Sequence, residues 1–297
     1  MSRGYQKNFA DGTQIGIVDV STGDVVHARR SIKYNWRAKD FLSVVTLDQI
    51  DDRLEKEFAR DEKVILNSVR DIVGFREITP RQRTSLDRLA AIHLIRSHAF
   101  RDAHVALVQD YLPKGVLDLA SSAELLEVFK AAKGRPPASG ELAAIVAEQA
   151  EKFATSPDLL PVSVRNSTNA VNKVLAKWTI QLISVSEDLP GLVLADTPIL
   201  HGRRKAGLFG FQDAGAVGDA DLIIVPIHRH LAACYSERKL RDVSVRTKQS
   251  LNWINSLLIR GATKEVACHP EDLQHTTRLI RNLDRYPAAN FDRAIIH

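Results

Sequence analysis

Residues 81–104 read RQRTSLDRLAAIHLIRSHAFRDAH, and their spacing decides how the middle of the chain folds. Apolar residues such as Leu86 and Leu89 recur with helical periodicity, which predicts an amphipathic helix running to about residue 112. At about 100° per residue, His93, Arg96 and His104 fall on the same apolar face. Because burying an unpaired guanidinium is costly, we expect Arg96 to meet a partner or to border a cleft.

The composition is typical of a folded globular protein. The chain has 297 residues, of which 44% are hydrophobic and 26% are charged. It contains no run of about 18 apolar residues, and residues 1–7 lack a signal-peptide core, so we expect a cytoplasmic protein without a membrane span. The two cysteines, Cys234 and Cys268, lie in apolar, strand-like surroundings, which argues against a disulfide framework.

The net charge is mildly positive, at +5 with a sequence pI of about 9.2. This surplus permits a polyanionic partner such as nucleic acid or a nucleotide, but an ordinary solvated surface also accounts for it. The oligomeric state is open, and no motif indicates a cofactor.

The patterns predict an α+β fold and a single domain over residues 1–297. An N-terminal β-hairpin (1–45) precedes a helical bundle with two long helices (46–176), and an antiparallel sheet with flanking helices follows (177–297). Strands are predicted at 14–20, 25–28, 178–186, 192–194, 221–227, 231–235 and 265–268, and helices at 47–72, 80–112, 121–132, 138–154, 167–176, 247–263 and from 269 onward. The glycine-rich stretch 200–220 is expected to be a loop.

Short segments in this order resemble the bacterial domain-of-unknown-function family 4238. They are Tyr5–Ala10 (that family's "fLrnFa"), Lys39-Asp40-Phe41 ("rdFY"), Glu62 in the first long helix, His93-Leu94-Ile95-Arg96 (Gln-x-x-Arg), Leu194–Ile199 ("TSDNPV"), Ile224–Ile227 ("PLS"), Asn255, and Val266-Ala267. The chain departs from the pattern in three places: it lacks the opening His-Tyr-Val-Pro, it has His93 for glutamine, and it has Thr197 for asparagine. The family has no established activity, so the resemblance implies an architecture and candidate positions only.

A polar cluster is the first candidate site. Its proposed catalytic residues are Glu62, His93, Arg96 and Asp196, with His104 and Asn255 as ligand-binding residues. A histidine and a carboxylate can perform general acid–base chemistry, and an arginine can hold an anionic group bidentately. The alternative is structural: a buried ion pair from Arg96 to Glu62 or Asp196 that fastens the helices to the sheet.

Three further patterns are weaker. Arg88 and His93 match the Arg-x4–6-His spacing of nucleotide-binding ribonucleases, but five residues on one helix point about 140° apart. His228 and His230, with His201, have a spacing compatible with zinc, although exposed strand histidines are the preferred interpretation. Glycines beside Arg203, Arg204 and Lys205 suggest a phosphate-binding loop, although a mobile surface loop is favoured.

The leading hypothesis is a protein that binds nucleic acid or a nucleotide in a polar Arg/His/Asp cleft. It includes hydrolysis of a phosphoester, as part of phage defence or a mobile element, with His93 as the proton-transfer group and Arg96 as the anion clamp. The rival hypothesis is a non-catalytic binding or regulatory protein in which these residues form a structural ion-pair network.

Overall fold

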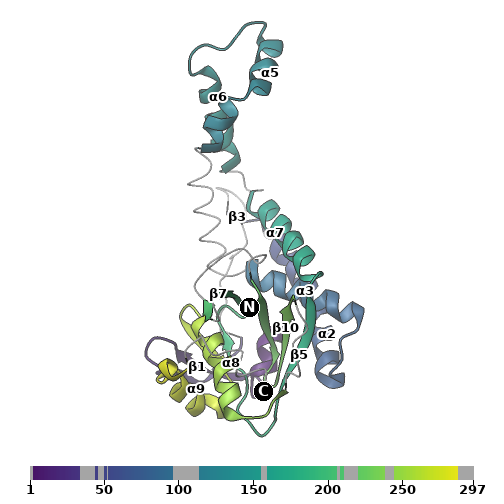
Figure 1. Ribbon diagram of the computed structural model, residues 1–297, viewed down its shortest axis with the longest axis vertical. Helices are drawn as coiled ribbons and strands as arrows, with labels where there is room; N and C mark the ends of the chain where they lie inside the picture. The colour runs from purple at the N-terminus through teal and green to yellow at the C-terminus, as the bar shows by residue number, and fades with distance from the viewer. Residues whose placement is uncertain are drawn as a thin grey trace.

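The computed structural model describes residues 3–33, 44–45, 50–51, 53–95, 114–154, 159–205, 208–210, 220–237 and 244–286; the side chains of 44–55, 151, 153–162 and 203–210 are outside that description. Its elements are shown in Figure 1. The fold is α+β, as the sequence predicts.

The N-terminal hairpin forms as predicted. Strand β1 (Gln14–Asp19) pairs antiparallel with β2 (Val25–Ser31). The Asp19 carboxylate accepts hydrogen bonds from the amides of Ser21 and Thr22, and Gly23 has a φ of 72°, so the turn chemistry closes the hairpin.

The hairpin belongs to a sheet that also contains strands from the far half of the chain. Strand β1 pairs antiparallel with β12 (Glu265–Cys268), which pairs with β6 (Leu194–Ala195), giving the order β2-β1-β12-β6. The first and last predicted subregions therefore share one hydrogen-bonded sheet.

The second sheet has the order β11-β5-β10-β9-β7-β8. Its strands are β5 (Thr179–Val185), β7 (Leu200–Lys205), β8 (Leu208–Gly210), β9 (Leu222–His228), β10 (Leu231–Ser236) and β11 (Ser244–Val245). All pairs are antiparallel except β11 with β5, which adds two parallel residues to the predicted antiparallel sheet. A separate pair joins β3 (Val44–Val45) to β4 (Ile50–Asp51).

The predicted loop at 200–220 is wrong in its first half. Residues 200–202 of β7 pair with β9, and 203–205 pair with β8. Glycines such as Gly202 and Gly210 were interpreted as loop residues, but ladder hydrogen bonds need only the backbone, so strand pairing outweighs the local preference.

The two long helices pack against each other. Helix α2 spans Arg53–Phe75 and α3 spans Pro80–Ile95, and the predicted apolar stripes, including Leu86 and Leu89, are buried. The amide of Gln82 donates to the Thr79 hydroxyl (3.3 Å), and the Gln82 side chain accepts from the Thr79 amide (2.8 Å). This capping box confirms the predicted helix start. The prediction beyond residue 95 falls outside the described residues.

The other helices lie around this body. Helices α8 (Lys248–Arg260) and α9 (Leu273–Ile280) lie on the opposite side of the molecule from α2 and α3 (Figure 1), and α7 (Leu159–Leu175) packs on α3. Short helices among the described residues include α1 (Arg3–Gln6), η1 (Lys7–Phe9), η3 (Pro270–Asp272) and η4 (Leu283–Arg285).

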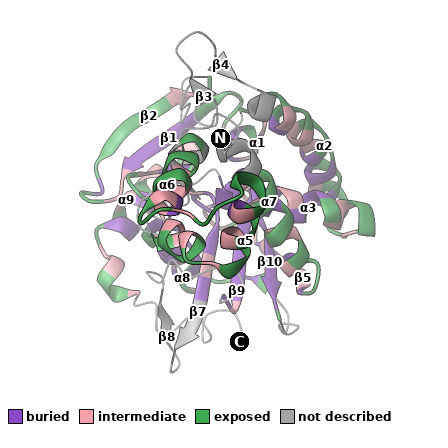
Figure 2. Ribbon diagram, turned by 90° about the horizontal axis from the view of Figure 1, so that it is seen from above, coloured by how far each residue is buried: buried purple, intermediate pink, exposed green. Residues whose placement is uncertain are grey.

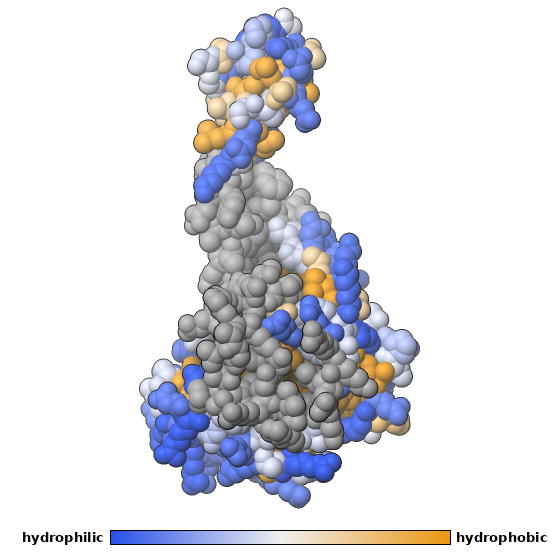
Figure 3. Space-filling view, viewed as in Figure 1, coloured by the Kyte–Doolittle hydropathy of each residue, from blue (hydrophilic) through white to orange (hydrophobic). Residues whose placement is uncertain are grey.

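Helices α5 (Ala123–Lys133) and α6 (Glu141–Ala154) lie at one end of the long axis, away from both sheets (Figure 1). Apolar surface is visible among hydrophilic residues at this end (Figure 3). Its exposed apolar residues are Leu117, Leu119, Val128 and Ile145. This end is therefore separate from the buried core of the sheets.

The core runs between the sheets and the helices that cover them, and strands β1, β9 and β10 are mostly buried (Figure 2). Both cysteines are buried free thiols within strands, as predicted. Burial raises the pKa of Cys268 to about 12 and raises that of Cys234 further above the ordinary value. Among the described helices, none combines the length and apolar character that a bilayer crossing requires.

Arg83 fastens helix α3 to its neighbours. Its guanidinium donates to the carbonyls of Leu175 and Trp178, at the end of α7 and the approach to β5, and lies 3.7 Å from the carboxylate of Asp87. Burial raises the pKa of Asp87, while hydrogen bonding to Tyr235 and the charge of Arg83 oppose that rise. The helix is thus held by carbonyls of the neighbouring segments, while the contact of Arg83 with Asp87 lies within α3 itself.

Candidate anion-binding site

The Asp196 carboxylate stabilises the fold by accepting hydrogen bonds from backbone amides. Asp196 follows β6, and its carboxylate accepts hydrogen bonds from the amides of Thr197, Thr263, Lys264 and Glu265, at 2.8–3.2 Å. Both oxygens are used twice, so the carboxylate fastens the end of β6 to the turn between α8 and β12. A strand-end carboxylate was expected over a cleft, and here its bonds go to backbone amides.

Asn255 holds the other end of the same strand. Its side chain is fully buried, donates to the carbonyl of Gly191 and accepts from the amide of Val193, each at 3.0 Å. His93 is also buried, and its ring lies 4.6 Å from that of Tyr5, whose hydroxyl donates to the Pro226 carbonyl. These two predicted site residues are therefore placed inside the protein.

The remaining predicted residues are not assembled into one described site. Glu62 is half-buried on α2, Arg96 and His104 lie outside the described residues, and Arg203, Arg204 and Lys205 lie on β7 without described side chains. On the continuous helix α3, Arg88 pairs with Asp61 at 2.7 Å, while His93 faces Tyr5. Arg88 and His93 thus point to different partners, as the helical geometry predicts.

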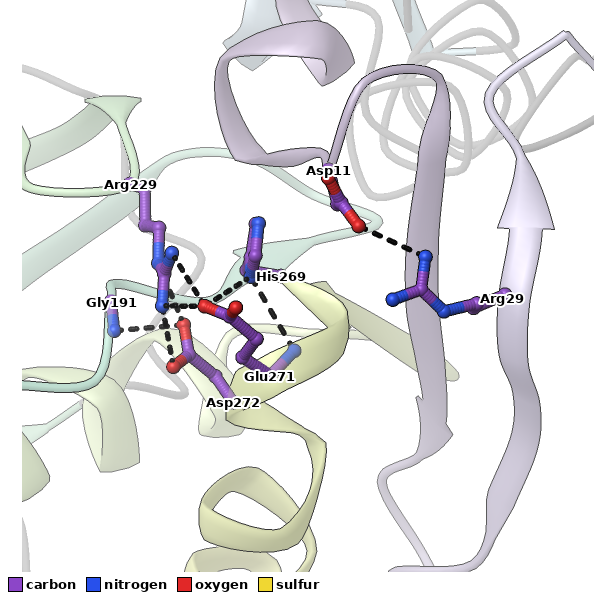
Figure 4. Close-up of polar contacts among 7 residues, drawn as sticks. All are labelled: Asp11, Arg29, Gly191, Arg229, His269, Glu271 and Asp272. Atoms are coloured by element: carbon purple, nitrogen blue, oxygen red, sulfur yellow. Dashed lines mark hydrogen bonds and ion pairs between the residues drawn. The ribbon is translucent and has the colours of Figure 1, made fainter.

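A different arginine, Arg229, forms a bidentate ion pair with a buried acid. Arg229, in the β9–β10 turn, binds the buried carboxylate of Asp272 bidentately, through Nε at 3.0 Å and Nη2 at 2.9 Å (Figure 4). The same carboxylate accepts the Gly191 amide at 2.9 Å. Glu271 approaches Arg229 only at 3.4 Å and is 71% exposed, so Asp272 is the dominant partner.

The backbone around this pair joins segments that are distant in sequence. The Arg229 amide donates to the Asn8 carbonyl, and the Leu192 amide donates to the Arg229 carbonyl. A Cβ atom on Gly191 would lie 2.2 Å from the Cγ of Arg229, so the close passage of the arginine requires glycine there. We call Arg229, Asp272 and Gly191 the sheet junction, because they connect the six-stranded sheet to the end of β12.

A cluster of basic side chains lies next to the sheet junction. It comprises Arg76, His228, Arg229 and His230, which we call the histidine–arginine cluster. His228 ends β9 at a register shift opposite Leu231, and the amide of His230 donates to Nδ1 of His228 at 3.2 Å. The bulge brings the two imidazoles within 6.3 Å, centroid to centroid.

Burial and positive charge keep both imidazoles neutral. Burial lowers the pKa of His228 to about 4, helped by the charges of His230, Arg76 and Arg229 and opposed by Glu187. The pKa of His230 is lowered by burial and Arg229, while Asp272 and Glu187 oppose that decrease. Since Nδ1 of His228 accepts an amide proton, its neutral ring carries its own proton on Nε2 and presents a donor there.

Arg76 reaches this cluster from an unusual backbone conformation. It follows α2 with a φ of 57°, in the left-handed region, and its amide donates to the Ile72 carbonyl. Its guanidinium donates to the His230 carbonyl at 3.5 Å. Glycine is preferred at this position after a helix, so an arginine here costs on the order of 1 kcal/mol of backbone strain.

The chemistry of the cluster suits an anion. The Arg76 guanidinium and a neutral imidazole donor suit a negatively charged ligand, and the Nδ1 atom of buried His230 has no hydrogen-bond partner among the described residues. In the described part of the chain, no group of three His, Cys, Asp or Glu residues is arranged to hold a metal ion. The sequence favoured exposed strand histidines at 228 and 230 over zinc ligands, but His230 is buried and His228 half-buried. Arg76 was not singled out, because its contact partner is 154 residues away.

Comparison with known proteins identifies one family. The model of the family described as "Protein of unknown function (DUF4238)" matches residues 2–272. No curated protein and no solved structure matches the chain.

Replacing Asp196 should destabilise the fold. We expect Asp196→Ala to lower the free energy of unfolding by about 2 kcal/mol or more, because four backbone amides lose their acceptor. Urea denaturation measures this change. The matched control is Asp188→Ala, an exposed acid in the β5–β6 connection, which should stay within about 0.5 kcal/mol of the parent. Equal effects of the two variants would contradict the framework role.

Gly191→Ala and Arg229→Ala should be coupled. Gly191→Ala should lower the free energy of unfolding by about 1–3 kcal/mol through overpacking. Arg229→Ala should lower it by about 2–4 kcal/mol, because the buried Asp272 carboxylate loses its partner. The double variant should cost less than the sum by at least about 0.5 kcal/mol, since removing the arginine makes room for the new methyl group. Strict additivity in a double-mutant cycle would argue against the close passage.

Acidification should weaken the fold through His228. Its folded-state pKa is depressed to about 4, so between about pH 6.5 and 4 the unfolded chain binds more protons and stability falls as the pH falls. Denaturation at several pH values should show a smaller decrease over this window for His228→Asn than for the parent. His27→Asn, on exposed β2, serves as the control and should leave the slope unchanged. An unchanged slope in His228→Asn would contradict the assignment.

Proposed function

The chain belongs to the DUF4238 family, whose description assigns no function, and we propose from its own geometry that it binds a phosphate-bearing anion at the histidine–arginine cluster. The ligand class is a nucleotide or a nucleic acid. One observation carries the proposal: Arg76 and Arg229 converge on two imidazoles whose pKa values are lowered. A bound phosphate would offset the positive charge of the arginines and accept hydrogen bonds from the donors of the cluster.

The two arginines have different parts in this proposal. Asp272 largely neutralises Arg229, which is thereby held rigidly in the turn. Arg76 has no carboxylate within ion-pair distance among the described residues, and its recorded bond goes to a carbonyl. Its positive charge is therefore the one available to a ligand, and the strained backbone at this residue supports a role beyond packing.

His228 is suited to binding a phosphoester rather than to acting as the general base of its hydrolysis. A general base must offer an unprotonated nitrogen to the substrate, but Nδ1 of His228 accepts the His230 amide and its Nε2 carries the proton. The neutral ring is suited to donate to a phosphate oxygen. We accordingly place His228 in ligand recognition, and His93 is buried against Tyr5.

The test removes the Arg76 side chain without disturbing the backbone. Arg76→Gly keeps the left-handed conformation, relieves its strain and should leave the thermal midpoint equal or higher. It should reduce affinity for a 20-nucleotide single-stranded RNA at least tenfold and reduce the salt slope of log K by about one. Arg70→Gln, on an exposed part of α2, should bind like the parent.

NMR titration of the imidazoles gives a second measurement in the same experiment. Inorganic phosphate, added alone, should raise the pKa of His228 from its value of about 4, because a bound anion stabilises the protonated ring. The rise should be absent in Arg76→Gly. An unchanged His228 pKa together with RNA affinity equal in Arg76→Gly and the parent would overturn the proposal.

A further inference from the structure

A second site lies between α2 and the start of α3, formed by residues other than those of the histidine–arginine cluster. It is a cavity of about 300 Å³. Its lining residues are Val64, Asn67, Ser68, Asp71, Thr79, Arg81 and Gln82. The α2 members follow the spacing i, i+3, i+4, i+7, so they form one face of that helix, and the others come from the cap and first turn of α3.

The floor and rim of the cavity differ in character. Ser68 is buried, and its hydroxyl lies 2.9 Å from that of Ser85, so these small residues close the bottom by linking the two helices. Val64 is 53% exposed at the rim and is the only apolar member of the lining. The capping box fixes the opposite wall, because Gln82 and Thr79 hold each other. The cavity is therefore polar and held in shape by hydrogen bonds on two sides.

Opposite charges line the two walls. Asp71 comes from α2 and Arg81 from α3, and neither forms an ion pair with any residue in the described ranges. A polyanion would meet the carboxylate of Asp71, and a metal ion would meet the guanidinium of Arg81. An apolar compound would find only Val64 to contact. These exclusions leave a small ligand that carries both charges.

We propose that this cavity binds a zwitterionic amino acid, with its carboxylate on Arg81 and its ammonium group on Asp71. The N-terminus of α3 adds its positive dipole end on the carboxylate side. The side-chain amides of Asn67 and Gln82 favour an amino acid whose own side chain forms hydrogen bonds. The volume lies at the small end of ligand sites, which suits a molecule of this size.

Three matched probes test the charge requirement. L-Glutamine carries both charges, 4-aminobutanamide lacks the carboxylate, and glutaramic acid lacks the ammonium group. Isothermal titration of the full chain should show glutamine binding at millimolar concentration or below, and at least tenfold tighter than either analogue. Absence of glutamine binding, or equal binding of an analogue, would overturn the proposal.

Substitutions of Asp71 and Arg81 test which residue binds each charged group of the ligand. In Asp71→Asn, glutamine should bind no better than glutaramic acid, and in Arg81→Gln no better than 4-aminobutanamide. Val64→Trp, at an exposed rim position, should block the cavity and abolish binding while the thermal midpoint stays unchanged. Arg70→Gln, beside Asp71 but outside the lining, is the control and should bind as the parent does. Glutamine binding retained in both Val64→Trp and Asp71→Asn would place the ligand elsewhere and contradict the site.

Discussion

The buried pairing of Arg229 with Asp272 is the interaction on which the arrangement of the two sheets depends. Asp272 lies in η3, shortly after β12 of the four-stranded sheet, and Arg229 lies in the β9–β10 turn of the six-stranded sheet. One bidentate contact therefore joins the two sheets. Asp272 is 6% exposed as a side chain and Arg229 is 22% exposed. A carboxylate so deeply buried needs a charged partner, so the pair constrains how the two sheets are placed against each other. It also requires glycine at position 191, where the arginine side chain passes close to the backbone.

This constraint also shapes the surface chemistry of the cluster. Because Arg229 is tied to Asp272, its backbone can donate to Asn8 and accept from Leu192 without the turn moving. The bulge at His228 is thereby fixed, and the two imidazoles are held side by side at low pKa. The structural ion pair of Arg229 and the proposed anion-binding histidines are thus adjacent, because Arg229 and both histidines lie at the β9–β10 turn.

Local patterns predicted the elements well, while long-range contacts decided the roles of polar residues. The Leu86–Leu89 stripe, the helix start at residue 80 and the N-terminal hairpin follow from local patterns, and all three are confirmed. The residues predicted to form a site were selected by residue type and local position along the chain. Asp196 satisfies amides 67–69 residues away, and Asn255 satisfies groups 62–64 residues away. No local pattern contains those partners, so their framework role could not be deduced beforehand.

The α2–α3 connection links the two proposed sites through a short stretch of backbone. Arg76 lies at its start and reaches the cluster, while Thr79 and Arg81 lie at its end and line the cavity. Packing of the two helices, with Ser68 against Ser85, fixes both ends of this connection. The sites differ in charge balance: the cluster has an excess of positive charge, and the cavity has one charge of each sign. The salt dependence of ligand binding therefore distinguishes the two sites. Added salt weakens the attraction of a ligand to a net charge far more than its attraction to two closely spaced opposite charges.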